Sequence, residues 1–307
     1  MQGIFLFNKP VGISSAGFLN QLKRNYFGKV PVGHGGTLDP LASGLLVVGV
    51  GKTYTRQLST LLKDTSKSYQ ATIVLGATSQ TYDGEGPISK TVGAIFPDDK
   101  KIKKMVADVA LRTKQIPPIF SAIKKEGKRA YDEARAGKNV VLESRSVSVL
   151  SFNIESIVQK SDTVEVVVSL SVSSGFYVRS FAHDVGEVLG VGGYLKGLVR
   201  THIGEFSLNE ALEAQDLDGE IELVFRVFGG VVGVGYRLFA DKTAQKWALG
   251  GFARNIDGNT VEIVGQGKMA VLSDFLEQLN KGPNGAVVGK TESYFRKKGE
   301  KKYGFKF

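Results

Sequence analysis

The chain has 307 residues, 42% of them hydrophobic, so it is long enough to bury the cores of two domains. Its apolar stretches are shorter than the roughly 18 residues of a membrane span, and we expect no signal peptide at the N-terminus. Cysteine is absent, which excludes disulfides and thiol nucleophiles and fits a cytoplasmic protein. The net charge of +10 favours a polyanionic partner.

The N-terminal part predicts strands around one helix. A strand over 4–12 is stopped by proline and glycine, and a helix follows over 14–28. We expect Ser15 to be its N-cap and Gly28 to end it. Alternating or apolar runs predict further strands at 45–50, 67–76 and 163–172.

Helical spacing returns twice in the middle of the chain. Residues 98–114 place apolar side chains on one face and lysines on the other, and residues 176–190 pass from strand character into a helix that Gly190 ends. The paired prolines in 115–122 exclude a helix interior there. Strands with irregularly interspersed helices predict an α+β fold with a mixed, mainly antiparallel sheet.

Composition changes in the glycine cluster 228–238, where we place the boundary between a catalytic domain, 1–227, and a small C-terminal domain, 228–307. In the second domain we expect one helix, 273–280, and several short strands. The strand candidates are 260–265, 268–272 and 285–290. Basic residues gather at 124–138 and in the tail 289–307.

The sequence gives little support for a nucleotide-binding loop or for a metal site. "GVGKT" (49–53) suggests a nucleotide-binding loop, but such a loop needs glycine where this chain has Leu46, and no amphipathic helix is clearly signalled after it. The histidines His34, His183 and His202 are isolated, without the spacing of metal ligands. We therefore expect neither a bound nucleotide cofactor nor a metal.

The segment "GHGGTLDPLASG" (33–44) presents a carboxylate at a constrained turn. Pro40 keeps Asp39 extended, and glycines on the other side permit a tight backbone. The segment could be an ordinary Asp-Pro turn or an edge where substrate meets a carboxylate. A charge held there needs a cation. Arg179, flanked by aromatic and aliphatic residues in "GFYVRS", is a candidate, although a strand arginine facing water fits the pattern too.

These residues fall within a longer match. "GHGGTLDPLASGLLVVGVGKTYT" closely resembles the signature of the TruB family of tRNA pseudouridine synthases, which act on uridine 55 of the T-arm. Four more segments match in the same order, and the resemblance spans roughly residues 3–215. They are "LFNKPVGISS" (6–15), "KSYQATIVLGATSQTYDGEG" (67–86), "QIPPIFSAIKKEGKRAYDEARAGK" (115–138) and "SGFYVRSFAHDVGEVLGVGGYLKGLVRTHIGEFSLNEA" (174–211).

The resemblance assigns roles. It implies the pseudouridine-synthase fold, with Asp39 as the catalytic aspartate, Arg179 as its partner and Tyr69 stacked on the target base. It implies that His34 enters the T-loop as the uridine flips out, and that an insertion at about 100–145 grips the RNA. Lys9, Tyr177 and Leu198 would complete the substrate site. The implied enzyme is a cytoplasmic monomer that acts on tRNA, with no cofactor, no membrane association and no obligatory protein partner.

The match also has departures. Asn8 stands where the family commonly has aspartate, and residues 216–307 match poorly. Position and size suggest a PUA-like RNA-binding domain for this C-terminal part. Two alternatives remain: a non-catalytic RNA-binding protein or tRNA-folding chaperone, and an RNA-guided catalytic subunit that relies on partner proteins. Asp39, Tyr69 and Arg179 argue against the first, and the insertion at 100–145 argues against the second.

Overall fold

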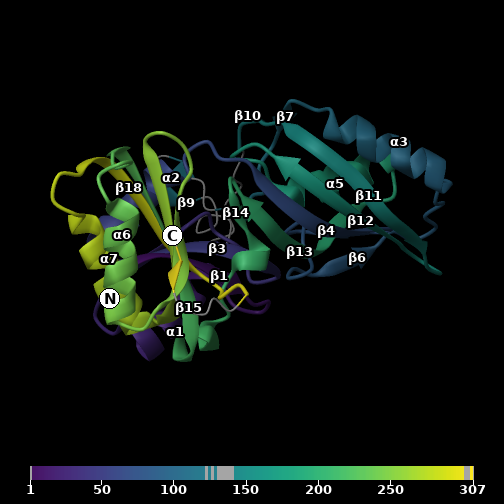
Figure 1. The fold of residues 1–307 in the computed structure, drawn as a ribbon. Coiled ribbons are helices and arrows are strands. Elements are labelled where there is room, and N and C mark those ends of the chain that lie inside the picture. Colours follow the sequence, from purple (N-terminus) through teal and green to yellow (C-terminus); the bar gives the residue numbers. More distant parts are fainter. Residues whose placement is uncertain (1, 122–123, 126–127, 130–141, 301–304, 307) are drawn as a thin grey trace. The chain divides into compact units, whose positions relative to one another are not determined.

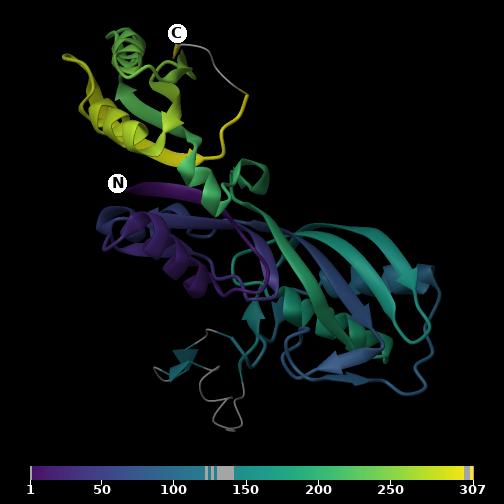
Figure 2. The same cartoon turned by 90° about the horizontal axis from the view of Figure 1, so that it is seen from below.

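β-strands joined by helices and turns make up this protein, as the sequence predicts. The computed structural model describes residues 2–121, 124–125, 128–129, 142–300 and 305–306, so most of the basic segment 124–138 lies outside the described residues. The chain divides into two units (Figures 1 and 2). One consists of Pro40–Ser43 and Asp64–Glu205, and the other of Met1–Asp39, Gly44–Lys63 and Phe206–Phe307. The predicted boundary at 227/228 stays a prediction.

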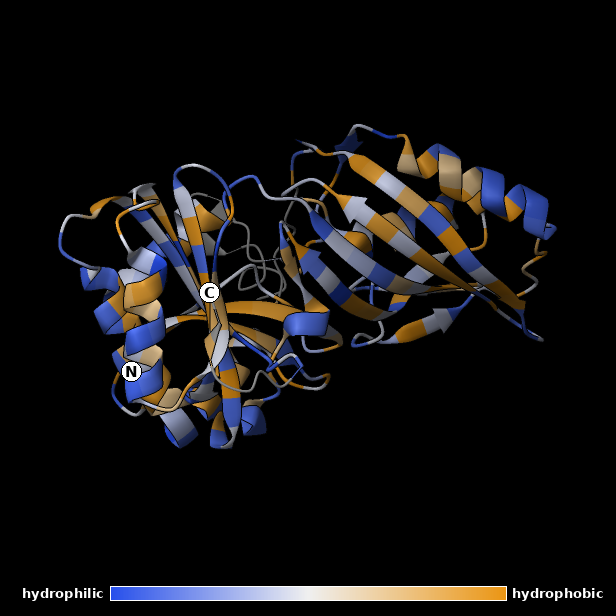
Figure 3. Ribbon diagram, in the orientation of Figure 1, coloured by the Kyte–Doolittle hydropathy of each residue, from blue (hydrophilic) through white to orange (hydrophobic). Residues whose placement is uncertain are grey.

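The unit formed mainly by Asp64–Glu205 is built on an antiparallel sheet. Its order is β11 (Val149–Gln159), β12 (Val164–Val172), β4 (Lys67–Leu75) and β13 (Gly193–Ile203). Every second residue of β12 is buried, and Figure 3 shows hydrophobic and hydrophilic bands following one another along the strands of this unit. The period of two therefore turns one face of β12 toward the core. The strands predicted at 67–76 and 163–172 are confirmed.

Two helices belong to the same unit and pack on each other, α3 (Asp99–Ala110) and α5 (Val178–Leu189). Asp98 caps α3 by accepting a hydrogen bond from the Lys101 amide, and Gly190 ends α5 with a φ of 70°. Both predicted helices are confirmed, although α5 has no preceding strand. Short pairs of strands complete the unit: β5 (Ala77–Ser79) with β6 (Ile88–Lys90), β7 (Lys114–Gln115) with β10 (Arg145–Ser146), and β8 (Lys124–Lys125) with β9 (Lys128–Arg129).

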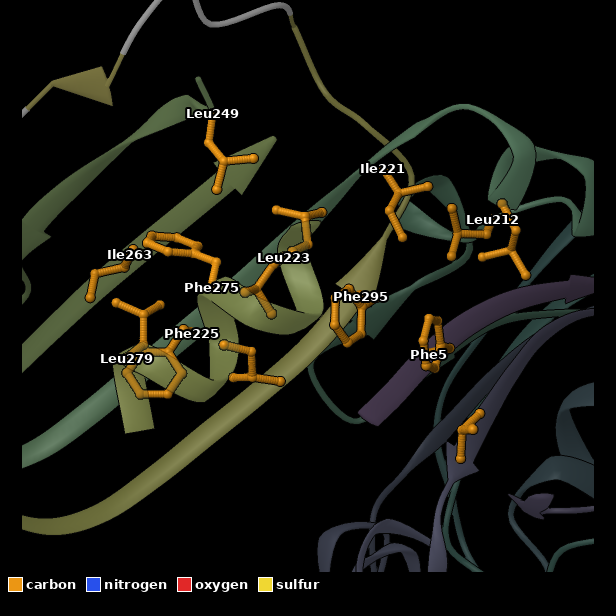
Figure 4. Close-up of a cluster of buried hydrophobic side chains, with 14 of the residues drawn as sticks. Phe5, Leu212, Ile221, Leu223, Phe225, Leu249, Ile263, Phe275, Leu279 and Phe295 are labelled. Carbon is orange, nitrogen blue, oxygen red and sulfur yellow. The ribbon is translucent and has the colours of Figure 1, made fainter. Parts of the chain in front are cut away.

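The other unit has a sheet in which sequence-distant strands meet. β1 (Gly3–Lys9) pairs antiparallel with β3 (Ala42–Val50) and parallel with β18 (Val287–Arg296), so Phe5 lies beside Phe295. The two rings stack with centroids 4.6 Å apart, within a core that continues under the C-terminal strands (Figure 4). The remaining strands are β2 (Val32–Gly35), which pairs with β3, then β14 (Phe206–Ser207), β15 (Glu220–Gly230), β16 (Gly250–Asn255), β17 (Thr260–Lys268) and β19 (Phe305–Lys306).

The N-terminal helices correct two expectations. α1 (Ser15–Leu22), continued by a π-helical turn η1 (Lys23–Phe27), is capped by Ser14 rather than Ser15, because the Ser14 hydroxyl accepts from the Gly17 amide. A helix does follow "GVGKT": α2 (Lys52–Leu61) starts directly after Gly51. Gly28 ends the first helical segment with a φ of 56°, as predicted.

The C-terminal segment alternates β15, α6 (Tyr236–Lys246), β16, β17, α7 (Met269–Lys281) and β18. Its strand order β18-β15-β17-β16 is that of a ferredoxin-like βαββαβ arrangement, with both helices on one side of the sheet (Figure 1). α6 was not predicted, and 268–272 opens α7 instead of forming a strand. Two short 3-10 helices, η2 (Leu208–Glu210) and η3 (Ala214–Asp218), precede β15. Among the described helices, none is long and apolar enough to span a membrane.

Candidate active site

The loop between β2 and β3 carries Asp39. His34 lies half-buried in β2, and Asp39 follows it in the loop, also half-buried. Local packing explains the two glycines between them. A Cβ added to Gly35 would come within 2.1 Å of Leu62, and Gly36 has a φ of 80°, which disfavours other residues. The missing side chain of Gly35 therefore lets the end of β2 lie against Leu62, which follows α2.

The residue before Asp39 is held by a buried serine. The hydroxyl of Ser15 donates to the carbonyl oxygen of Leu38 at 2.9 Å and accepts from the Leu38 amide at 2.8 Å. Ser15 and Leu38 are 1% and 3% exposed, so solvent does not compete for these bonds. From the sequence, Ser15 was predicted only as a helix cap, and its contact with Leu38 was not predicted.

Lys9 is fully buried, an unusual place for an ammonium group. Its Nζ donates to the carbonyl oxygens of Pro10 and Ile13, each at 2.7 Å. Lys9 thereby holds the turn that leads from β1 into α1. Its predicted role in binding substrate stays a prediction.

Asn8, where the resemblance leads us to expect aspartate, has a neighbour suited to its amide. The Asn8 Nδ2 donates to the Glu213 carboxylate at 2.7 Å. An aspartate here would lose that donor and set two carboxylates side by side. Asparagine is therefore compatible with the Glu213 carboxylate beside it, because its amide can donate a hydrogen bond.

We expect Asn8→Asp to lower the free energy of unfolding by about 1–3 kcal/mol at neutral pH, since the hydrogen bond is replaced by repulsion. Asn8→Ala, which removes the bond without adding charge, is the control and should cost less. Denaturant unfolding at neutral pH measures this, and equal stability of the two variants would contradict the account.

In the other unit, Arg179 is a buried cation in the first turn of α5, 7% exposed. Its guanidinium donates to the carbonyl oxygens of Phe120, at 3.0 Å, and Thr81, at 3.3 Å. It also forms an ion pair with Asp83 at 3.4 Å. Asp83 is 2% exposed and accepts from the Thr81 hydroxyl and the Glu85 amide. Asp83 was not among the residues singled out from the sequence, although it lies in the matching segment 67–86.

Tyr69 lies on β4, 8% exposed, opposite Arg200 of β13. Arg200 is 1% exposed and donates a hydrogen bond to the Tyr69 hydroxyl. Burial lowers the pKa of the Arg200 guanidinium, against the effect of Tyr69. Burial also lowers the pKa of Lys67, and the nearby charge of Arg200 lowers it further. Two cations thus gather at one end of β4, beside the predicted stacking residue.

The other predicted residues of this unit lie on the same elements. Tyr177 precedes α5, and its backbone is held by the Gln115 side chain, which donates to its carbonyl at 2.9 Å and accepts from its amide at 2.8 Å. Leu198 lies half-buried on β13 opposite Ala71.

Tyr69, Tyr177, Arg179 and Leu198 therefore belong to one unit, and Lys9, His34 and Asp39 to the other. The pairing of Asp39 with Arg179 stays a prediction. In the described part of the chain, no group of three or more histidines and acids could hold a metal ion.

A second feature lies in the C-terminal segment. The turn after β15 leads into α6 through Gly233 and Gly235, with φ near 80° at both. Gly235 is the N-cap, and no side chain caps the helix. Arg237 follows in the first turn and is exposed. Backbone amides at a helix start and a guanidinium are the groups that bind oxyanions.

Comparison with known families finds a match for each part of the chain. The family described as TruB family pseudouridylate synthase (N terminal domain) matches residues 24–178. The acylphosphatase family matches residues 223–307. The C-terminal segment is therefore acylphosphatase-like rather than clearly PUA-like, and the predicted α+β class holds.

Individual relatives agree with the first assignment. tRNA pseudouridine synthase B of Mycobacterium sp. (strain KMS) is 42% identical over 221 residues, 72% of this chain and 73% of the relative. The protein of that name from Corynebacterium aurimucosum is 36% identical over 274 residues, 88% of this chain and 91% of the relative. A chain in a solved Cbf5-Nop10-Gar1 complex is 26% identical with a TM-score of 0.52, and the match covers 70% of this chain and 53% of that one. The protein belongs to the TruB family of pseudouridylate synthases.

Proposed function

We propose that this protein is a tRNA pseudouridine synthase that isomerises uridine 55 in the T-arm. The observation that carries the proposal is 42% identity to a tRNA pseudouridine synthase B along 73% of that relative's length. The reaction breaks the bond between ribose C1′ and N1, turns the base, and joins C1′ to C5. The C5 proton is lost and N1 gains one, so no electrons are exchanged and atoms balance.

Asp39 is the residue we assign to the chemistry. A carboxylate can act as a nucleophile or as a base on the ribose. The target base sits in a folded loop and must leave the stack before reaction. We propose that Tyr69 stacks on the extruded base and that Tyr177 and Leu198 form walls of its pocket. His34 then fills the gap that the base leaves in the loop.

The remaining assignments are electrostatic. Arg179 serves as the cation for Asp39, and Lys9 supports the substrate site through the turn that it holds. In the segment 223–307, lysine and arginine outnumber aspartate and glutamate two to one, so we assign this segment a share in holding the RNA backbone. The protein acts as a cytoplasmic monomer without an obligatory protein partner.

Incubation of the purified protein alone with unmodified tRNA, followed by mapping of pseudouridine, tests the proposal. The expected result is one modified position, 55. Binding without isomerisation would instead favour a non-catalytic RNA chaperone. Activity that requires added proteins and a guide RNA would favour the RNA-guided subunit.

Replacing Arg200 should impair the same reaction through Tyr69. We expect Arg200→Met to lower the single-turnover rate about tenfold, the effect of losing a charged hydrogen bond of about 1.5 kcal/mol. In a Tyr69→Phe background, which lacks the hydroxyl, the same replacement should change the rate by less than about twofold, because the interaction is already gone. Lys196→Met is the control, since it removes an exposed cation of the same strand. Additive losses in the double variant would contradict a role through Tyr69.

A second activity is favoured by the acylphosphatase match over residues 223–307. We propose that this segment hydrolyses acyl phosphates, with the amides at the start of α6 and the guanidinium of Arg237 receiving the phosphoryl group. Phosphate release from acetyl phosphate by the purified protein tests this, with p-nitrophenyl phosphate, a phosphate monoester, as the comparison substrate. Hydrolysis of the acyl phosphate alone is expected. Turnover of neither compound would leave the segment with a role in RNA binding only.

A further inference from the structure

One hydroxyl group satisfies both backbone groups of the residue before Asp39. Ser15 Oγ donates to the Leu38 carbonyl oxygen and accepts from the Leu38 amide, at 2.9 and 2.8 Å. A serine hydroxyl can donate one hydrogen bond and accept two, so Ser15 can form both contacts at once. The bonds join residues 23 positions apart in the sequence, and both residues are buried.

These bonds constrain the backbone of Asp39 from one side. Leu38 is fixed at its amide and its carbonyl, and its side chain is buried. Pro40 acts from the other side, because its ring restricts the conformation of the residue that precedes it. Asp39 thus has a constrained neighbour on each side.

Ser15 is itself firmly placed. It is the first residue of α1, and it is buried. The Lys9 ammonium holds the preceding turn through the carbonyls of Pro10 and Ile13. A continuous path of short contacts therefore leads from the end of β1 through the start of α1 to the residue beside Asp39.

We propose that Ser15 is a positioning residue for Asp39: its hydroxyl sets the Leu38 peptide groups and thereby the direction of the carboxylate. The inference rests on the proposed function, in which Asp39 carries the chemistry. The side chain of Ser15 acts through the backbone and not on the RNA. Its loss should therefore reduce the rate of the chemical step and leave RNA affinity unchanged.

The neighbouring serine provides a matched control. Ser15→Ala removes the hydroxyl that holds Leu38, whereas Ser14→Ala removes a hydroxyl of the same helix start that does not contact Leu38. We expect Ser15→Ala to lower the single-turnover rate on a T-arm stem-loop by roughly tenfold to a hundredfold, the scale of a small misplacement of a reacting group. The Kd for the stem-loop should stay within about twofold. Ser14→Ala should keep the wild-type rate even if its Tm falls equally, and Ser15→Thr, which keeps the hydroxyl, should recover most of the rate.

Hydrogen exchange of the Leu38 amide gives a readout that needs no activity. The amide should be protected in the wild type and in Ser14→Ala, and exchange faster in Ser15→Ala. If Ser15→Ala does not fold, Ser15→Cys, a weaker donor of similar size, takes its place in both measurements. Unchanged exchange, or equal rates in the Ser14 and Ser15 variants, would overturn the proposal. A wild type that shows protection but forms no pseudouridine would overturn the proposed function and leave the contact standing.

Discussion

Asp39→Asn is expected to abolish pseudouridine formation on a T-arm stem-loop, with a loss of at least about a thousandfold in single-turnover rate. Asparagine keeps the size of the side chain and its ability to accept a hydrogen bond, but it is neither a nucleophile nor a base at neutral pH. The loss should fall on the rate and not on RNA affinity, because binding depends on cations spread over the protein. Filter binding and pseudouridine mapping on the same samples separate the two quantities.

The closest available control is another half-buried carboxylate of the same unit. Glu213, which accepts from Asn8, can be changed to glutamine, which keeps the size of the side chain and an acceptor oxygen. Glu213→Gln should retain the wild-type rate. Retained turnover in Asp39→Asn would exclude Asp39 as the catalytic group, and a loss of both activity and binding would point to a structural role for its loop.

Elements with strong periodicity could be predicted, and those built on small or ambiguous residues could not. β12 buries valine or leucine at every second position over its whole length, which makes the period of two clear. α6 buries Tyr236 beside two alanines, and its start is preceded by glycines, so no apolar stripe marks it. In 268–272 a lysine is followed by four apolar residues, a run too short for helix and strand to be distinguished by period alone.

Some residues of the candidate site could likewise be predicted from the sequence, and others could not. Asp39 and Tyr69 belong to segments that match a family, whereas the partners that hold the site are visible only in three dimensions. Arg200 lies opposite Tyr69 because β13 pairs with β4 with two register shifts, which no local pattern contains. Ser14 and Ser15 differ by one position, so sequence cannot say which one caps the helix and which one reaches Leu38. If the helix began one residue later, Ser15 would be the cap and would no longer point toward Leu38, since successive helix positions point in different directions.

The acylphosphatase-like segment leads to the second large expected effect. Arg237→Gln should lower the hydrolysis of acetyl phosphate by about a hundredfold to a thousandfold, the cost of removing one donor from a site that stabilises developing negative charge. Arg237 lies exposed in the first turn of α6, so the replacement should leave the fold intact. Phosphate release at saturating substrate, with Tm measured alongside, checks both points.

Arg254→Gln is the matched control, because Arg254 is an exposed arginine of the same segment whose guanidinium already binds Glu262 at 2.6 Å. It should keep full hydrolytic activity. The two activities should also separate: Arg237→Gln forms pseudouridine at the wild-type rate, and Asp39→Asn hydrolyses acetyl phosphate at the wild-type rate. Such a reciprocal pattern requires two independent sites in one chain. If Arg237→Gln instead weakens tRNA binding and no variant affects phosphate release, the α6 turn serves the RNA backbone, and the hydrolytic assignment is wrong.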